Sequence, residues 1–366
     1  MAKNLPTFDS VQGISILKVI LRDKFARIAF YTLLCLYLFV FLASFISPYN
    51  KEYSNRDKAY CPPSKIYVIN QEGKLSLPYT YNYTRYFDTE NYDSKYIEDK
   101  TKKYKVKYFA KGEKYKLFGL IPFDRHFYNV EEGGELYLLG TDINGRDNFS
   151  RLLYGGQISL TIGFLALLVS FPLGMLYGGI SGYIGGKTDF VMMRIAEAIM
   201  SIPSFYLLII LASILPANMS SVQRFALIVL ILALIGWAGF SRVVRGMVLS
   251  IKKKEFVVAS EALGASNMRT IIYHILPQTL SYVIVAMTLS VPSYILSESG
   301  LSFLGLGIQQ PDASWGNMLK EAQEFINIIS RPWLLTPGFL IFVAVLSFNV
   351  IGDTIRDAVD PNSKER

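Results

Sequence analysis

The chain of 366 residues is 51% hydrophobic and only 18% charged, and its mean hydropathy is +0.30. Soluble domains carry about 25% charged residues, so this composition predicts a polytopic membrane protein. The net charge of +8 does not indicate nucleic-acid binding, because basic residues gather at the cytoplasmic ends of membrane spans. Two cysteines and two histidines predict neither a disulfide framework nor a metal-ligand cluster.

The first apolar run, Ile28–Ile46, holds no charged residue and has about the 20 residues that cross a bilayer core. It is too long for the hydrophobic region of a signal peptide, and Pro48 and Tyr49 follow it instead of a small-residue cleavage pattern. We therefore expect an uncleaved first span. Basic residues before it place the N-terminus in the cytoplasm, namely Lys18, Arg22, Lys24 and Arg27.

Residues 49–139 form a polar, lysine-rich block that holds 15 of the 24 tyrosines. Its alternating segments Tyr104–Phe109 and Tyr115–Phe118, separated by Lys111–Glu113, predict a β-hairpin. We expect a small extracytoplasmic β-rich subdomain, since the charge bias of membrane loops counts only over short loops and near span ends. Two roles remain equally weighted for it, a docking surface for a substrate-binding partner and a spacer.

Five further apolar segments complete a six-span helical membrane protein with both termini in the cytoplasm. They are Ile158–Ile180, Phe190–Leu215, Phe225–Leu249, Thr279–Ser299 and Leu334–Ile351. Glycines and Pro172 in the second span predict close helix packing, which is favoured over a gating hinge.

Charged residues at membrane depth are costly and therefore indicate function. Arg194 and Glu197 are candidates for the lining of a translocation path. The favoured alternative is an ion pair at the cytoplasmic edge, since about one helical turn separates the two residues from the end of the span. Glu298 is a third candidate and suits an interhelical hydrogen bond equally well. Arg242 and Arg245 end the fourth span, where they can reach the cytoplasmic interface.

The stretch Ser181–Thr188, SGYIGGKT, ends like a phosphate-binding loop. Ser181 replaces the first glycine of that motif, and an apolar span precedes it instead of a strand. Nucleotide binding is therefore not expected here, and Lys187 marks a cytoplasmic loop.

The loop Ser250–Pro277 contains a short amphipathic helix. Residues at i, i+3, i+4 and i+7 share one of its faces, namely Phe256, Ala259, Ser260 and Leu263. Glu255 suits the start of this helix, Gly264 its C-terminal stop, and Pro277 the start of the next helix. Periodicity alone favours an interfacial helix that covers lipid.

This loop resembles the EAA loop of bacterial ABC importer permeases, which has the pattern EAA-x3-G-x9-I-x-LP. Ala259, Gly264 and Leu276-Pro277 keep the spacing of the pattern. The departures are Val258 for glutamate, Ser260 for the second alanine and His274 for isoleucine. They shift the emphasis from the glutamate to the apolar face and the glycine stop.

Four further stretches resemble the C-type membrane subunit of oligopeptide and dipeptide importers. They are Gly140–Gly155 (GTDINGRDNFSRLLYG), Ala238–Gly246, Glu298–Gly307 with Trp315-Gly316, and Gly352–Pro361. The resemblance extends over residues 140–361. The block 49–139 departs most, because that family has a much shorter link there.

The resemblance implies a multi-pass permease subunit in the inner membrane of a bacterium. Its partners would be a second homologous permease subunit, two ABC ATPase subunits, an extracytoplasmic peptide-binding protein, a peptide substrate and membrane lipid. The chain would have no catalytic residue and bind no cofactor, since ATP and Mg²⁺ belong to the ATPase subunits. The implied ATPase-coupling residues are Glu255, Phe256, Val257, Ala259, Ser260, Glu261, Ala262, Leu263, Gly264, Ala265 and Ser266.

The expected division is 1–48 for the N-terminus and first span, 49–139 for the subdomain, 140–357 for the transmembrane domain with its loop 250–277, and 358–366 for the tail. The alternative cargo is nickel or another small solute. A secondary transporter or channel would more often show inverted repeats and would need no docking loop. A membrane enzyme would need a clustered catalytic set, which the sequence does not suggest.

Overall fold

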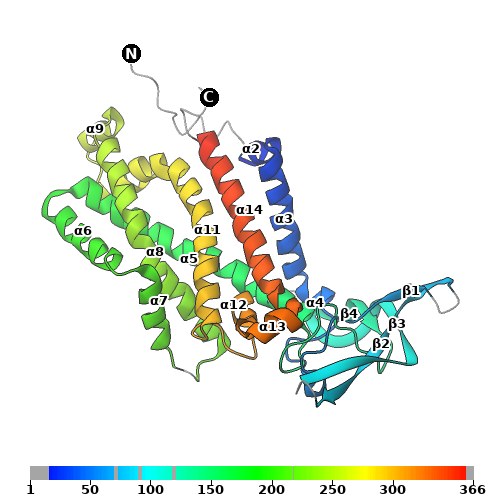
Figure 1. The fold of residues 1–366 in the computed structure, drawn as a ribbon. Helices are drawn as coiled ribbons and strands as arrows, with labels where there is room; N and C mark the ends of the chain where they lie inside the picture. Colours follow the sequence, from blue (N-terminus) through cyan, green and yellow to red (C-terminus); the bar gives the residue numbers. More distant parts are fainter. Residues whose placement is uncertain (1–15, 70–72, 90–92, 118–120, 217, 360–366) are drawn as a thin grey trace. The chain divides into compact units, whose positions relative to one another are not determined.

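The structure is a computed structural model that describes residues 16–69, 73–89, 93–117, 121–216 and 218–359 (Figure 1). The chain is mostly helical, with a small antiparallel sheet, and it divides into two compact units. The helical unit consists of Met1–Leu34, Thr161–Leu301 and Phe342–Arg366, and the sheet unit consists of Cys35–Leu160 and Ser302–Ile341. Phe118 and the predicted tail from Asp360 onward lie outside the described residues.

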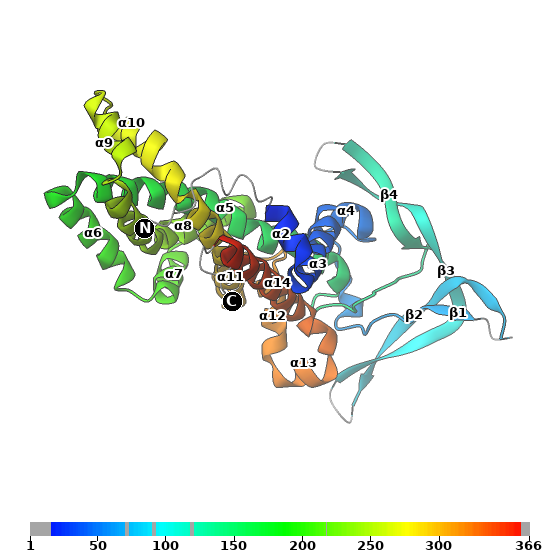
Figure 2. The same cartoon turned by 90° about the horizontal axis from the view of Figure 1, so that it is seen from above.

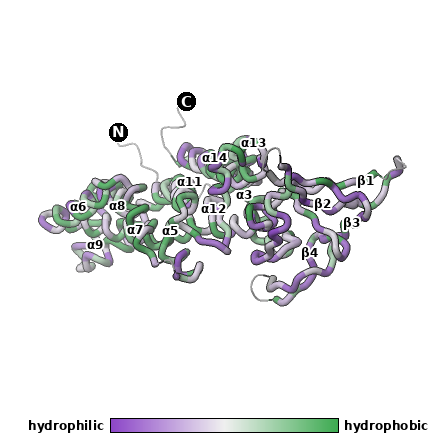
Figure 3. Tube along the Cα trace, turned by 60° about the horizontal axis from the view of Figure 1, so that its bottom comes forward, coloured by the Kyte–Doolittle hydropathy of each residue, from purple (hydrophilic) through white to green (hydrophobic). Residues whose placement is uncertain are grey.

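Within the described residues, five helical stretches are long and apolar enough to cross a membrane. They are α3 (Lys24–Phe41), α5 (Asn148–Ile184), α8 (Ser221–Ile251), the run Asn267–Phe303 that ends in α11 (Leu280–Phe303), and Pro332–Val359 with α14 (Thr336–Val359). Each coincides with a predicted span. Their composition explains this, because each contains an 18-residue apolar window with at most two charged residues, which suits the hydrocarbon core of a bilayer (Figure 3).

The remaining predicted span, Phe190–Leu215, is not one straight helix. It consists of α6 (Gly186–Met200) and α7 (Ser204–Ser213), which meet at an angle of 79°. Pro203 explains the break, since it has no N–H to donate and disfavours helical backbone in the residue before it. Both short helices lie alongside α8 (Figure 2).

Close packing of α5 against α8 depends on a stripe of glycines. A Cβ atom on Gly178 would lie 2.3 Å from the carbonyl oxygen of Ser241, and one on Gly182 would lie 2.9 Å from that of Arg245. Gly174 meets Phe240 in the same way, at 2.8 Å. The small residues of the second span therefore serve close helix contact, as predicted.

In the part of the sheet unit that the structure describes, four antiparallel strands form one sheet in the order β1-β2-β3-β4. They are β1 (Tyr67–Ile69), β2 (Leu75–Asp88), β3 (Asp93–Leu117) and β4 (Ile121–Val130). The prediction of a β-rich block is thus confirmed. Tyrosines contribute much of the small core of this unit. Cys61, Tyr83 and Tyr137 are buried there, and the hydroxyl oxygens of Tyr53 and Tyr137 lie 2.8 Å apart.

The predicted hairpin turn at Lys111–Glu113 is wrong. Strand β3 runs through this position and pairs with β4, with a shift of register between Lys111 and Tyr115. A Cβ atom on Gly112 would lie 2.5 Å from Cδ2 of His126, which belongs to β4. This glycine therefore permits a close contact within an irregular strand instead of a turn.

Short helices connect these elements. They are α2 (Ile16–Arg22), α4 (Ala43–Ile46), η1 (Arg56–Lys58), α9 (Glu255–Ala262), α10 (Asn267–Arg269), η2 (Thr270–Ile275), η3 (Leu276–Thr279), α12 (Trp315–Leu319), η4 (Lys320–Gln323), α13 (Phe325–Ser330) and η5 (Pro332–Leu335).

Candidate functional site

Helix α9 forms where the loop was predicted to be helical, and it ends at the predicted glycine. Gly264 has φ +80°, and its N–H donates to the carbonyl of Glu261 at 2.9 Å. The N–H of Ala265 donates to the carbonyl of Ser260 at 3.1 Å, which completes a Schellman cap. A Cβ atom on Gly264 would meet nothing within 4 Å, so the backbone conformation alone calls for glycine here.

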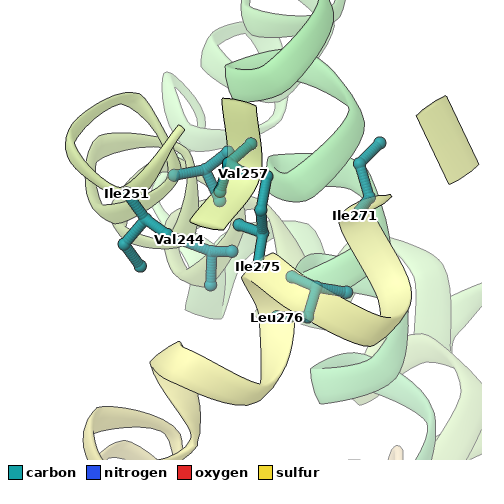
Figure 4. Packing of buried hydrophobic residues seen from close by; sticks show 7 residues of the cluster. Val244, Ile251, Val257, Ile271, Ile275 and Leu276 are labelled. Atoms are coloured by element: carbon teal, nitrogen blue, oxygen red, sulfur yellow. The ribbon is translucent and has the colours of Figure 1, made fainter. Parts of the chain in front are cut away.

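A buried hydrophobic cluster attaches α9 to the helices around it (Figure 4). Val257 is fully buried against residues of α8 and of the segment that follows α9. The cluster consists of Val244, Val248, Ile251, Val257, Ile271, Ile275 and Leu276. The single buried valine of α9 thus fixes the position of this two-turn helix.

Polar contacts add to this attachment. The Tyr183 hydroxyl at the end of α5 donates to Glu261 Oε1 at 2.7 Å. The hydroxyls of Ser260 and Thr270 lie 3.3 Å apart, and Lys252 Nζ donates to the carbonyl of Gly182 at 2.8 Å. Helix α9 is therefore connected both to α8 and to the end of α5.

The opposite side of α9 is exposed and apolar. Leu263 keeps 89% of its surface exposed, Val258 55% and Phe256 39%. Ser260, predicted on the same face, instead points inward to Thr270. The other predicted coupling residues are exposed or half-buried, namely Glu255, Ala259, Glu261, Ala262, Gly264, Ala265 and Ser266.

One ion pair between α6 and α8, near the loop that contains α9, was not predicted from the sequence. Two of the three guanidinium nitrogens of Arg245, Nε and Nη2, donate to the Asp189 carboxylate at 2.5 Å. Ser181 also donates to Asp189, at 2.5 Å. The pair joins α8 to α6 across 56 residues of sequence, and a single sequence carries no local signal for such a pairing.

The helical unit also contains a cavity of about 390 Å³ between α5, α7, α8 and α11. Among the described residues that line it, none has a charged side chain. Six hydroxyl groups line it, those of Ser204, Ser290, Ser293, Ser297, Tyr282 and Tyr294. This site was not predicted, although Ser290, Ser293 and Ser297 stand at i, i+3 and i+7 of an apolar span, a spacing that places polar groups on one helical face.

Glycine and tyrosine shape the cavity together. A Cβ atom on Gly236 would lie 2.0 Å from the hydroxyl oxygen of Tyr294, so only glycine leaves room for that ring. The Tyr294 hydroxyl donates to Ser170 Oγ at 2.9 Å, which holds the ring in place. Gly239 also lines the cavity, but a Cβ atom there would meet only Met200, at 3.9 Å.

The three charged residues predicted for a path lie elsewhere. Arg194 and Glu197 form an ion pair of 3.0 Å on α6, with 65% and 37% of their side chains exposed. Glu298 is fully buried on α11, and Ser299 donates to its carboxylate at 3.4 Å. The structure brings none of the three to the described lining of the cavity.

The GTDINGRD motif forms a buried charged cluster in the sheet unit. Arg146 Nε donates to Asp142 Oδ2 at 2.6 Å, and Arg151 Nε lies 3.5 Å from the same oxygen. Asp147 accepts from the backbone and hydroxyl of Ser150 at 2.7 and 2.5 Å. Burial nevertheless raises the pKa of the Asp147 carboxyl to about 7.

Comparisons with known proteins agree with these motifs. The family "Binding-protein-dependent transport system inner membrane component" matches residues 170–365, and "N-terminal TM domain of oligopeptide transport permease C" matches residues 13–63. The dipeptide transport system permease protein DppC of Bacillus subtilis is 44% identical over 224 residues, which are 61% of this chain and 68% of that relative.

Two oligopeptide permeases are similarly close. OppC of Haemophilus influenzae is 42% identical over 229 residues, which are 62% of this chain and 71% of the relative. OppC of Escherichia coli K12 is 43% identical over 230 residues, which are 62% and 73% of the two chains. This chain therefore belongs to the family of inner membrane components of binding-protein-dependent transport systems, in its oligopeptide and dipeptide permease C branch.

Proposed function

We propose that this chain is the membrane-spanning subunit of an ABC importer for oligopeptides or dipeptides. With a second homologous subunit it forms the translocation path, and two partner ATPases bind ATP and Mg²⁺ and hydrolyse the nucleotide. The names of the relatives support the cargo, since they are dipeptide and oligopeptide permeases. An extracytoplasmic peptide-binding protein delivers the substrate.

The observation that carries this proposal is the double role of helix α8. Its residues Val244, Val248 and Ile251 hold α9, while Leu232, Gly236 and other residues nearer its start line the cavity. A helix of 31 residues transmits a displacement at one end to the other. Movement of α9 therefore changes the shape of the cavity.

In this mechanism, α9 inserts its exposed side into a groove of a partner ATPase. Leu263, Phe256 and Val258 are buried on docking, which suits the recognition of a helix in an apolar groove. ATP binding closes the ATPase pair and carries α9 with it. The transport cycle is then a rigid-body switch between two packed states, with the nucleotide biasing their populations.

The cavity suits a peptide whose side chains vary. Its hydroxyls donate to and accept from main-chain amides, which every peptide presents. Because no charged group lines its described part, neither acidic nor basic peptides are repelled. We propose that this surface, and not Arg194, Glu197 or Glu298, lines this subunit's half of the path.

We further propose six spans, with α6 and α7 as the broken third one. Both termini and α9 lie in the cytoplasm, where Lys252, Lys253 and Lys254 satisfy the positive-inside rule. The strands β1–β4 then lie outside the cytoplasm, either as a docking surface for the binding protein or as a spacer.

Reconstitution of the complete transporter tests the function. The chain, its partner permease and both ATPases are placed in proteoliposomes with the binding protein, and uptake of a labelled tripeptide is measured. We expect uptake that requires ATP and is unaffected by ion-gradient uncouplers. Uptake driven by an ion gradient without ATP would identify a secondary transporter, and uptake of Ni²⁺ in place of the peptide would refute the cargo.

A further inference from the structure

A patch of four aromatic rings, three of them exposed and one half-buried, lies where strands β3 and β4 meet helix α4. We define it as Phe45, Tyr108, Phe109 and Phe127. The ring centroid of Phe45 lies 5.9 Å from that of Phe109 and 6.1 Å from that of Phe127, which are 6.0 Å from each other. Tyr108, Phe109 and Phe127 keep 59%, 57% and 43% of their surfaces exposed. Contiguous exposed rings of this kind mark interaction surfaces.

The backbone conformation of Phe109 supports a functional role for this patch. Its φ is +51°, in the left-handed region that bulky residues avoid. Such backbone persists where the surroundings enforce it, and it gathers at functional sites. Here the residue with the unusual backbone is Phe109 itself, and its ring packs on those of Phe45 and Phe127.

The length of α3 places the patch at the edge of the membrane. Its 18 residues span about 27 Å, close to the roughly 30 Å of a hydrocarbon core. Phe41 ends the helix, and Phe45 lies one helical turn further on in α4. Leu38, Phe39 and Phe41, in the last turn of α3, are also exposed apolar side chains. Aromatic rings are enriched in this interfacial layer.

A buried histidine connects strands β3 and β4 to the residue that follows α4. His126 Nδ1 on β4 lies 2.5 Å from the carbonyl oxygen of Ser47, which follows α4 directly. Its Nε2 lies 3.0 Å from the carbonyl oxygen of Glu113 on β3. The end of the first span and the two strands thus share one polar link and one aromatic cluster.

Basic residues are frequent along β3 and β4 near the aromatic rings, and Arg125 Nη1 donates to the carbonyl of Phe109 at 3.5 Å. Residues 105–130 hold six lysines and arginines against two acidic residues. Lys107 pairs with Glu131 at 3.3 Å and Lys111 with Asp124 at 3.7 Å, while Lys114 and Arg125 are exposed. An excess of cations beside apolar rings complements anionic phospholipid headgroups.

We propose that the aromatic patch lies in the interfacial layer of the bilayer, so that strands β3 and β4 bind anionic phospholipid. This inference requires that α3 crosses the membrane, and it does not depend on the peptide cargo. It assigns a ligand to a segment that departs from the family pattern.

Photocrosslinking in the assembled transporter tests the proposal. The photoreactive residue p-benzoylphenylalanine is introduced as Phe109→Bpa or Phe127→Bpa, in vesicles of phosphatidylcholine and phosphatidylglycerol. The matched control is Phe87→Bpa on β2, where 59% of the side chain is exposed. Phe39→Bpa on α3 is the positive control for lipid. Adducts are identified by mass spectrometry.

We expect phospholipid adducts at positions 109 and 127, as at position 39, and several-fold fewer at position 87. Adducts of 109 and 127 with the second permease subunit or the binding protein would overturn the proposal. Equal lipid labelling at 87, or none at 109 and 127 while 39 is labelled, would overturn it as well.

Charge reversal tests the headgroups separately. The shift in unfolding temperature between vesicles with and without phosphatidylglycerol is compared for the intact chain and for Lys111→Glu with Lys114→Glu. We expect the double variant to lose the shift. Lys102→Glu with Lys103→Glu, on the same strand, serves as control and should retain it. A shift retained by both double variants contradicts the role of anionic headgroups.

Discussion

At the residue scale, Leu263 allows the proposed coupling role of α9 to be tested separately from folding. Because 89% of its surface is exposed, Leu263→Asp adds a charge without disturbing a packed core. We expect normal membrane insertion but loss of peptide-stimulated ATPase activity, since a carboxylate in an apolar groove loses its hydration. The measurement is ATPase activity of the reconstituted complex with and without peptide and binding protein.

Leu75→Asp is the matched control, because Leu75 on β2 is also 89% exposed. It should leave stimulated ATPase activity near that of the unchanged complex. Normal stimulation in the Leu263→Asp complex would remove the coupling role from α9.

A second residue-scale prediction concerns Asp147, whose pKa is raised from 3.8 to about 7 by burial. A carboxyl with a raised pKa contributes stability that is fully present below its unfolded value and is lost as the pH rises through its folded value. The stability of the intact chain should therefore fall between about pH 4 and 7 by more than that of Asp147→Asn. Unfolding temperatures measured across this range give the slope.

Ser150→Ala tests the direction in which the pKa of Asp147 shifts. Its hydroxyl and backbone N–H both donate to Asp147 and lower the pKa. Loss of the hydroxyl should raise the folded-state pKa of Asp147 further, so the stability loss should extend to higher pH. Identical slopes for the intact chain and Asp147→Asn would show that Asp147 does not titrate in this window.

At the element scale, the contact between α5 and α8 leaves no room for a methyl group at Gly178. Gly178→Ala places a Cβ 2.3 Å from the Ser241 carbonyl oxygen, so the helices must separate. We expect a loss of about 1–3 kcal/mol in the free energy of unfolding, as for other overpacked sites. Unfolding of the chain in nanodiscs measures the change.

Gly246→Ala is the control within α8, since a Cβ there would meet nothing within 4 Å. It should be neutral or stabilising by up to about 1 kcal/mol, because alanine favours a helix over glycine. If both variants have the same stability, the glycine stripe has no packing role.

At the scale of the whole molecule, transport should be indifferent to the charge of peptide side chains, because the described lining of the cavity is uncharged. Ser293→Asp introduces a carboxylate at that lining. We expect it to favour uptake of lysine-containing tripeptides over glutamate-containing ones by about tenfold, equivalent to roughly 1.4 kcal/mol. Competition between the two labelled peptides measures this ratio.

Ser201→Asp provides the comparison, since Ser201 is exposed between α6 and α7 and does not line the cavity. Its peptide preference should match that of the unchanged transporter. An unchanged preference in Ser293→Asp would place the substrate path elsewhere.

Much of this architecture is readable from the sequence. Five of the six spans predicted from apolar runs coincide with long apolar helices, because length and hydropathy decide that question locally, whereas the remaining one is a bent helix pair. The glycine stop at Gly264 follows from local backbone geometry. The turn expected near Gly112 was misplaced because His126, distant in sequence, packs against that glycine. The contact of Asp189 with Arg245 was hidden for the same reason, since only the folded helices bring the two together.

The glycine stripe of α5 also fixes the number of residues between Gly174 and Gly182. Gly174, Gly178 and Gly182 recur every four residues, so they follow one line along the helix. Removal of a single residue between them would rotate everything beyond it by about 100°, turning side chains with a Cβ toward α8. This stretch should therefore tolerate many substitutions at its other faces but no insertion or deletion. Comparisons among related chains should then show gaps in the loops and none between residues 174 and 182.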